Sequence, residues 1–175
     1  MKIIQTNSSE YLNRIIDLYV EAFSTGQSEQ YIDSDELSEY LDLIFKEGYT
    51  ILAIENHELS GAVLILPLSF DKAIPAQISE SFNLKQCLYV AEMMVAEKVR
   101  GQGIGKLLMK AFFDTADKSL YSDSFIRVWD ENTPAISLYE KAGFKTIANI
   151  QQTKIKADKS GTFVMNKIYL HHILD

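Results

Sequence analysis

A glycine-rich segment in the second half of the chain has the residue types of an anion-binding turn. It reads Arg100-Gly101-Gln102-Gly103-Ile104-Gly105-Lys106 and lies between an apolar stretch and an amphipathic one. Glycine permits positive φ and a close approach of the backbone, and the first N–H groups of a helix have no partner within the helix. The segment is therefore predicted to cradle a phosphate group at the start of a helix.

Two common phosphate-binding motifs do not fit this segment. A dinucleotide G-x-G-x-x-G motif needs glycine at position 106, where the chain has Lys106. A Walker A loop needs glycine at position 100 and Ser or Thr at position 107, where the chain has Arg100 and Leu107. A tight glycine turn that binds no ligand is the structural alternative.

A second segment supports a resemblance to a known family. From Asn132 to Phe144 the chain reads NTPAISLYEKAGF. This segment is similar to the N-x-x-A-x-x-x-Y-x-x-x-G-F segment of the GNAT family of N-acetyltransferases, and the glycine turn resembles the Q/R-x-x-G-x-G/A signature of the same family. Both segments occur in the family's order, so the chain resembles a GNAT enzyme.

The resemblance implies acetyl-CoA as the donor substrate. No metal is predicted, because the histidines have no close Cys or carboxylate partners at metal-ligand spacing. The resemblance assigns the pyrophosphate to Arg100, Gly101, Gln102, Gly103, Ile104, Gly105 and Lys106. It assigns the pantetheine arm to the main chain of Met93, Met94 and Val95, and to the side chain of Asn132. A backbone N–H in residues 93–95 could also polarise the thioester carbonyl.

Tyr139 is the candidate general acid that the resemblance implies. It lies four residues after Ala135, on the same face of a predicted helix. A phenol has a pKa of about 10 and a thiol such as cysteine about 8.5, so a phenol can protonate a departing thiolate. An ordinary core tyrosine is the alternative interpretation.

Glu92 is the one carboxylate in the apolar strand predicted over residues 87–95. A buried carboxylate is costly unless it has a partner. Glu92 could accept the proton of an incoming ammonium group, with a pKa raised by burial. Alternatively, it could form a structural ion pair with a cation such as Arg127 on the neighbouring strand.

The acidic residues are concentrated in the first half of the chain. The net charge of −7 divides into −9 for residues 1–90 and +2 for residues 91–175. Seven acids accompany only one base, Lys46, between positions 29 and 47: Glu29, Asp33, Asp35, Glu36, Glu39, Asp42 and Glu47. The resemblance assigns this half largely to acceptor recognition, so a small cationic primary amine is predicted as the acceptor. A solvated helix face is the alternative for these acids.

Two other functions are compatible with the same motifs. One is acetylation of a protein or peptide amine, and the other is a module that binds CoA without catalysis. The acidic balance disfavours nucleic acid as a partner. A homodimer remains open.

Length and composition favour one soluble globular domain over residues 1–175. The chain is 47% apolar and 23% charged. Its best apolar run ends at Pro67, far short of the ~18 residues of a membrane span, and its start has no signal-peptide core. The single Cys87 cannot form an internal disulfide. A cytoplasmic protein that does not bind membranes is predicted.

The elements that must position the site follow from hydrophobic periodicity. Helices are expected from Ser9 to about 23, from Ser34 or Asp35 to 47, over 104–115, and over 133–142 with Thr133 as N-cap. Strands are expected over 2–6, 49–54, 61–68, 87–95, 125–129, from 144 onward, and over 163–170. The prediction is an α+β fold with a mixed, mostly antiparallel sheet flanked by helices. By the resemblance, the strand over 87–95 splays from the strand over 125–129.

Overall fold

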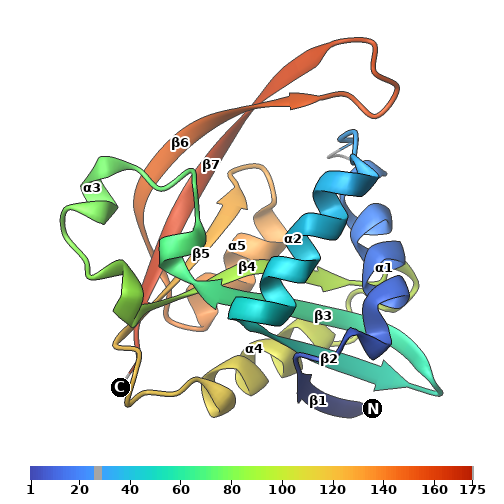
Figure 1. Ribbon diagram of the computed structural model, residues 1–175, viewed down its shortest axis with the longest axis horizontal. Helices are drawn as coiled ribbons and strands as arrows, with labels where there is room; N and C mark the ends of the chain where they lie inside the picture. The colour runs from blue at the N-terminus through green and yellow to red at the C-terminus, as the bar shows by residue number, and fades with distance from the viewer. Residues whose placement is uncertain (26–28, 175) are drawn as a thin grey trace.

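A seven-stranded sheet forms the centre of the computed structural model, which describes residues 1–25 and 29–174 (Figure 1). The strands are β1 (Lys2–Thr6), β2 (Tyr49–Glu55), β3 (Glu58–Pro67), β4 (Cys87–Val95), β5 (Asp123–Trp129), β6 (Lys145–Ile155) and β7 (Thr162–Ile173). The helices are α1 (Leu12–Ser24), α2 (Ser34–Glu47), α3 (Ala76–Ser79), α4 (Ile104–Thr115) and α5 (Thr133–Lys141). None of these helices is long and apolar enough to cross a membrane.

The strand order is β1-β2-β3-β4-β5-β7-β6, and only the β4–β5 pair is parallel. Helix α4 lies between β4 and β5 in the chain, as a parallel connection requires. These findings confirm the predicted α+β fold with a mixed, mostly antiparallel sheet.

Helices cover both faces of the sheet. Successive residues of a strand point to opposite faces. On β3, Ala62 and Leu64 pack with α1 and α2, whereas Val63 and Ile65 pack with α4 and α5. Both faces of β3 are therefore buried, which explains its continuous apolar sequence.

Strands β4 and β5 separate after four residue pairs. Their pairing begins at Cys87 and ends where Val90 meets Ile126. On its other edge β4 continues along β3, with a bulge because Val90 pairs with Ile65 while Glu92 pairs with Leu64. The predicted splay is confirmed, and it leaves residues 92–95 beside an opening in the sheet.

The β6–β7 hairpin curves over the side of the sheet that carries α1 and α2 (Figure 1). Near its tip, Lys156 forms an isolated β-bridge with Gln30. The N–H of Tyr31 donates to the carbonyl of Ile155 (2.9 Å), and the N–H of Ala157 donates to the carbonyl of Glu29 (2.7 Å). The tip is thereby attached to the segment between α1 and α2.

The N-cap of α5 differs from the prediction. Asn132 is the N-cap, its side chain accepting a hydrogen bond from the N–H of Ala135 at 3.3 Å, and Thr133 is the first helical residue. Asn and Thr are both good N-caps, and proline is tolerated in the first turn of a helix. Local preference therefore did not distinguish Asn132 from Thr133.

Helix α1 begins differently from the prediction, whereas α2 begins at Ser34 as predicted. Helix α1 begins at Leu12, after a 3-10 turn over Ser9–Tyr11. Asp33 is the N-cap of α2, because its Oδ1 accepts from the N–H groups of Asp35 and Glu36 at 3.0 and 3.1 Å.

Candidate active site

The glycine turn has the geometry of an anion cradle. Gly101 and Gly103 have φ of +77° and +83°, and a Cβ atom at either position would meet no other atom within 4 Å. Gly103 is the N-cap of α4, so the first N–H groups of the helix point out of the turn. Gly105 has a different role: a Cβ atom there would lie 3.1 Å from the side chain of Leu138 on α5. Two glycines thus shape the cradle, and the third brings α5 against α4.

Basic side chains flank this turn. Arg100 is exposed, and its Nε donates to the carbonyl of Val95 at 3.2 Å, which links the turn to the end of β4. Lys106 is exposed on the first turn of α4. Lys98, just before the turn, forms an ion pair with Glu58. The open backbone and the cations at positions 100 and 106 fit a pyrophosphate.

The end of β4 brings the predicted main-chain contacts to the opening. Met93 and Val95 pack on the side of α4 and α5, and Met94 is buried against α1 and α2. Because the β4–β5 pairing ends at Val90, one edge of residues 93–95 faces the opening. An extended arm could lie along this edge.

Tyr139 is buried on α5, where 5% of the residue is exposed. Its ring packs edge-on to Phe144, with ring centroids 6.4 Å apart. Burial raises the pKa of the Tyr139 phenol well above 10, and the nearby carboxylate of Glu92 adds to this effect. The phenol therefore keeps its proton throughout the neutral range, as a general acid must.

Asn132 is exposed at the start of α5. Its side-chain oxygen is used by the helix cap, so the predicted free amide is only half free. The amide N–H₂ group remains as the donor that a ligand could use.

Glu92 does not form the ion pair with Arg127 that was one of its two predicted roles. Its Oε1 accepts a hydrogen bond from the hydroxyl of Tyr40 at 3.4 Å. Arg127 donates instead to Asp71 (2.8 Å) and to the hydroxyl of Tyr169 (3.0 Å), and that hydroxyl donates to the second oxygen of Asp71 (2.8 Å). Arg127 is therefore already neutralised by a buried carboxylate.

The electrostatic environment of Glu92 suits a base. Burial is the largest effect and raises its pKa, while the positive charges of Lys167, Arg127 and Lys154 and the hydrogen bond from Tyr40 oppose the shift. The pKa stays above the ordinary value of 4.5. A carboxylate with a raised pKa takes up a proton more readily at neutral pH.

Four residues near Glu92 were not predicted from the sequence: Tyr19, Tyr40, Lys154 and Lys167. Tyr19 of α1 and Tyr40 of α2 pack edge-on, with ring centroids 6.4 Å apart. Lys167 interrupts the apolar strand β7 as Glu92 interrupts β4, so the same sequence signal could have identified it. The two tyrosines have no such signal, because a tyrosine on an amphipathic helix is ordinary.

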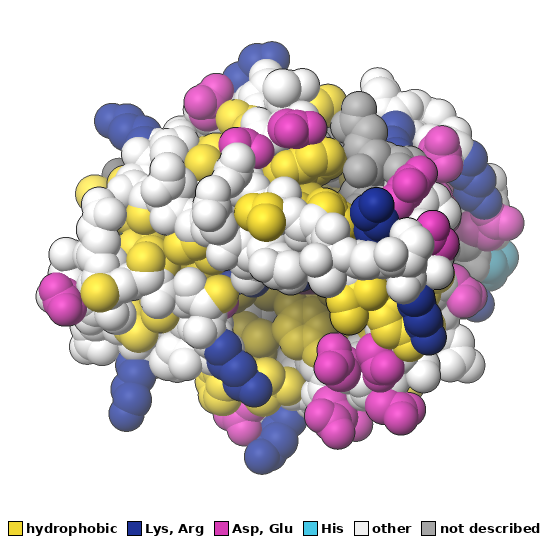
Figure 2. Space-filling view, turned by 90° about the horizontal axis from the view of Figure 1, so that it is seen from above, with side chains coloured by type: hydrophobic (Ala, Val, Ile, Leu, Met, Phe, Trp, Pro, Cys, Tyr) yellow, Lys and Arg dark blue, Asp and Glu magenta, His cyan; other side chains and the backbone are white. Residues whose placement is uncertain are grey.

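The α1 and α2 side of the molecule is hollowed beside the β6–β7 hairpin. Figure 2 shows this hollow with a hydrophobic floor and a rim of both acidic and basic side chains. The acids of α2 at Asp35, Glu36 and Glu39 are exposed, whereas Asp33 is half-buried and caps the helix.

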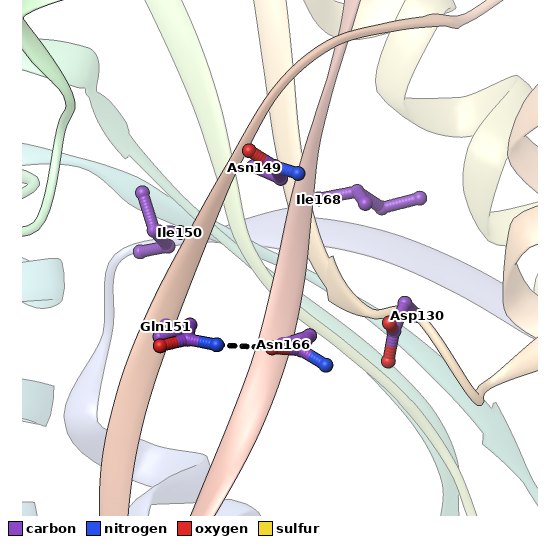
Figure 3. A pocket seen from close by; sticks show the side chains of 6 residues that line it. All are labelled: Asp130, Asn149, Ile150, Gln151, Asn166 and Ile168. Atoms are coloured by element: carbon purple, nitrogen blue, oxygen red, sulfur yellow. Dashed lines mark hydrogen bonds between the residues drawn. The ribbon is translucent and has the colours of Figure 1, made fainter.

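A separate groove of about 570 Å³ lies along the hairpin (Figure 3). It is lined by Asp130, Asn149, Ile150, Gln151, Asn166 and Ile168, and Gln151 donates to Asn166 at 3.1 Å. None of the predicted site residues lines it. Among the described residues, no three His, Cys, Asp or Glu side chains are arranged to hold a metal ion.

Comparisons with known proteins agree with this geometry. No curated protein sequence matches the chain. A ribosomal-protein-alanine N-acetyltransferase from Brucella melitensis has a similar structure, with a TM-score of 0.75, 17% identity, and coverage of 99% of this chain and 100% of that chain. A putative acetyltransferase from Salmonella typhimurium, solved with its cofactor acetyl-CoA, has a TM-score of 0.73, 15% identity, and coverage of 100% and 95%.

A GNAT family acetyltransferase from Elizabethkingia anophelis, solved with acetyl-CoA bound, has a TM-score of 0.67, 20% identity, and coverage of 99% and 97%. At these identities the structures establish the fold. The model of the acetyltransferase (GNAT) family matches residues 12–144, which contain the glycine turn, the helices α1 to α5 and the strands β2 to β5. The resemblance seen in the motifs is confirmed, and the chain belongs to the GNAT family of acetyltransferases.

Proposed function

We propose that the protein transfers the acetyl group of acetyl-CoA to the primary amine of a small molecule that arrives as an ammonium ion. The observation that carries the proposal is the placement of Glu92 and Tyr139 at one opening in the sheet. Glu92 lies toward α1 and α2, Tyr139 lies on α5, and the charge of Glu92 affects the pKa of Tyr139. A base and an acid on the two sides of one opening suit an acyl transfer through it.

The residues present would hold acetyl-CoA along this opening. The turn at Gly101 and Gly103 and the start of α4 would bind the pyrophosphate. The free edge of residues 93–95 and the amide N–H₂ of Asn132 would bind the pantetheine arm. When bound, acetyl-CoA supplies an acyl group activated as a thioester.

The two titratable residues then handle protons. Glu92 accepts the proton that the ammonium must lose before its nitrogen can attack. The nitrogen then bonds to the carbonyl carbon, and Tyr139 donates a proton to the sulfur as the carbon–sulfur bond breaks. The second proton that the nitrogen loses restores the phenol. Burial raises the pKa of the phenol, and the same apolar surroundings raise the pKa of a thiol. The pKa values of the proton donor and of the departing thiol therefore stay close to each other.

The shape of the acceptor side favours a small molecule over a protein. The hairpin tip is hydrogen-bonded to residues 29–31, which closes one side of the hollow against an extended chain. The exposed acids of α2 would attract an ammonium ion toward the hollow. A protein amine is the second candidate, because two of the structurally similar proteins are ribosomal-protein-alanine acetyltransferases.

The proposal is tested by measuring CoA release from acetyl-CoA with polyamines, amino acids, aminoglycosides and peptides as acceptors. Turnover with a small amine supports it. Turnover with peptides alone would support the second candidate. Binding of acetyl-CoA without any turnover would contradict both and indicate a CoA-binding module.

Replacing Gly103 by Glu is expected to weaken CoA binding at least tenfold, or about 1.4 kcal/mol. The variant introduces a negative charge and a strained φ where the pyrophosphate would lie. Calorimetry with CoA measures the change. Gly161→Glu is the matched control, because a Cβ atom there also meets nothing within 4 Å and its φ is not positive. Equal affinities of the two folded variants would contradict the cradle.

A further inference from the structure

Two lysines from the β6–β7 hairpin share one face of the sheet near Glu92. Lys167 pairs with Ile150, and Lys154 lies four residues after Ile150 on the same strand. Residues that pair across strands, and alternate residues along a strand, point to the same face. Lys154, Gln152 and Lys167 therefore share a face, and both lysines are half-buried.

That face is the one toward the reaction centre. Lys167 pairs with Trp129 on β5, two residues after Arg127, and Arg127 pairs with Tyr169. Arg127 and Tyr169 are joined to Asp71 by hydrogen bonds on this same side. The negative charge of Glu92 also raises the pKa of both lysines, against the lowering effect of burial.

The charges on this face do not balance. The negative charge of Asp71 neutralises Arg127. The one negative charge of Glu92 then remains to balance the two positive charges of Lys154 and Lys167. Within the described residues, neither lysine ammonium has a carboxylate at ion-pair distance or a hydrogen-bond acceptor. The excess is one positive charge, which equals the charge of one carboxylate.

Gln152 adds a polar group without a partner. Its side-chain oxygen is buried, and no hydrogen bond to it is found among the described residues. A buried polar group that lacks a partner destabilises the fold. A side-chain amide can turn to present its N–H₂ group, so Gln152 could donate to an anion held between the lysines.

Resting on the proposed function, we propose that the acceptor amine also carries a carboxylate and that Lys154 and Lys167, with Gln152, bind this carboxylate. Amino acids carry both an amine and a carboxylate, so they are acceptors of the proposed class. In such a complex Glu92 faces the amine and the lysines face the acid group. The exposed acids of α2 meet only the ammonium end during approach.

The fold maintains these cations at a cost to its stability. Burial lowers the pKa of Lys167 to about 8, and it also lowers the pKa of Lys154. A lysine whose pKa is lower in the folded state favours the neutral form, so its charge destabilises the fold at neutral pH. Groups that destabilise the fold are common at binding sites, where function opposes stability.

The test compares each L-amino acid with its own carboxamide as acceptor, in the wild type and in Lys154→Met and Lys167→Met. We expect the wild type to prefer the acid by at least about tenfold in kcat/KM, because charge-assisted hydrogen bonds are lost in the amide. Each methionine variant should lower kcat/KM for the acid by a similar factor more than it lowers kcat/KM for the amide, since both acceptors share any effect of the lost charge on Glu92. Lys145→Met, an exposed lysine of β6, is the matched control and should change neither.

Thermal unfolding gives a readout that does not depend on turnover. At pH 7 we expect Lys167→Met to unfold at the wild-type temperature or above it. Millimolar amino acid should raise the unfolding temperature of the wild type, its carboxamide should not, and the rise should be absent in Lys167→Met.

The outcomes separate this inference from the proposed function. If no amine is acetylated, the proposed function fails, and the thermal shift still decides the anion site. Equal shifts with acid and amide, equal losses of kcat/KM for both, or a lower unfolding temperature of Lys167→Met would overturn the inference. A preference for ethanolamine phosphate over both ethanolamine and the amino acids would overturn the carboxylate in favour of a phosphate.

Discussion

Tyr139→Phe is expected to lower kcat by about 10²–10⁴, the usual contribution of general acid catalysis. Phenylalanine keeps the ring that packs against Phe144 and removes only the proton that the departing thiolate needs. Steady-state kinetics with the best acceptor measures the loss, and calorimetry should find CoA affinity little changed. Because burial keeps the Tyr139 phenol protonated above pH 10, the pH profile of the variant should have the wild-type shape.

A half-buried tyrosine of the same core provides the control for this variant. The hydroxyl of Tyr49 is buried without a hydrogen-bond partner among the described residues, and its ring packs in the same core as Tyr139. Tyr49→Phe should therefore retain wild-type turnover. A wild-type kcat for Tyr139→Phe would show that Tyr139 is a core residue and not the general acid. Lower stability of Tyr139→Phe with unchanged chemistry would lead to the same conclusion.

Glu92→Gln is expected to lower kcat/KM at neutral pH by about 10²–10⁴, because the ammonium loses its built-in base. In the wild type, kcat/KM should rise with pH as Glu92 loses its proton, with a midpoint above the ordinary 4.5. The glutamine variant should lack this rise and recover activity only as the free amine itself loses its proton. A pH series from 4.5 to 10 measures both profiles.

The stability of the same variant distinguishes a base from a structural carboxylate. The folded state raises the pKa of Glu92, so it favours the protonated form. The resulting stabilisation is fully present below the unfolded pKa and is lost as pH rises through the folded pKa. Glutamine resembles the protonated form, so Glu92→Gln should be at least as stable as the wild type at pH 7. A strongly destabilised variant with an unchanged pH profile would show that Glu92 is structural.

Tyr40→Phe is the companion variant for Glu92. It removes the hydrogen bond that the Tyr40 hydroxyl donates to the Glu92 carboxylate and leaves the charge of Glu92 in place. That hydrogen bond lowers the pKa of Glu92, so its removal should move the acidic limb of kcat/KM to higher pH.

The sequence alone predicted the parts of the site that are local in the chain. The backbone of the glycine turn is decided by Gly101 and Gly103, since few other residues adopt their φ values. The α5 segment predicted a helix that carries Tyr139, and the periodicity of β4 predicted a strand that carries Glu92. The resemblance to the GNAT family then assigned these segments to one acetyl-CoA site.

The partners of charged side chains were decided by tertiary structure. Arg127 pairs with Asp71, which lies 56 residues earlier in the chain, and Glu92 bonds to Tyr40, which lies 52 residues earlier. No spacing rule connects residues so far apart. The ion pair of Glu92 with Arg127 was a reasonable expectation for adjacent strands, but Arg127 forms its ion pair with Asp71 instead.

The α2 acids and the β6–β7 lysines show most clearly which features the sequence predicts and which only the tertiary structure decides. From the sequence, the seven acids between 29 and 47 suggested that the acceptor side is negative. The fold leaves most of these acids exposed and turns Lys154 and Lys167 inward beside Glu92. A sequence records how many charges a region has. Only the folded register, in which a shift of one residue reverses the face of every side chain, decides which charges meet the substrate.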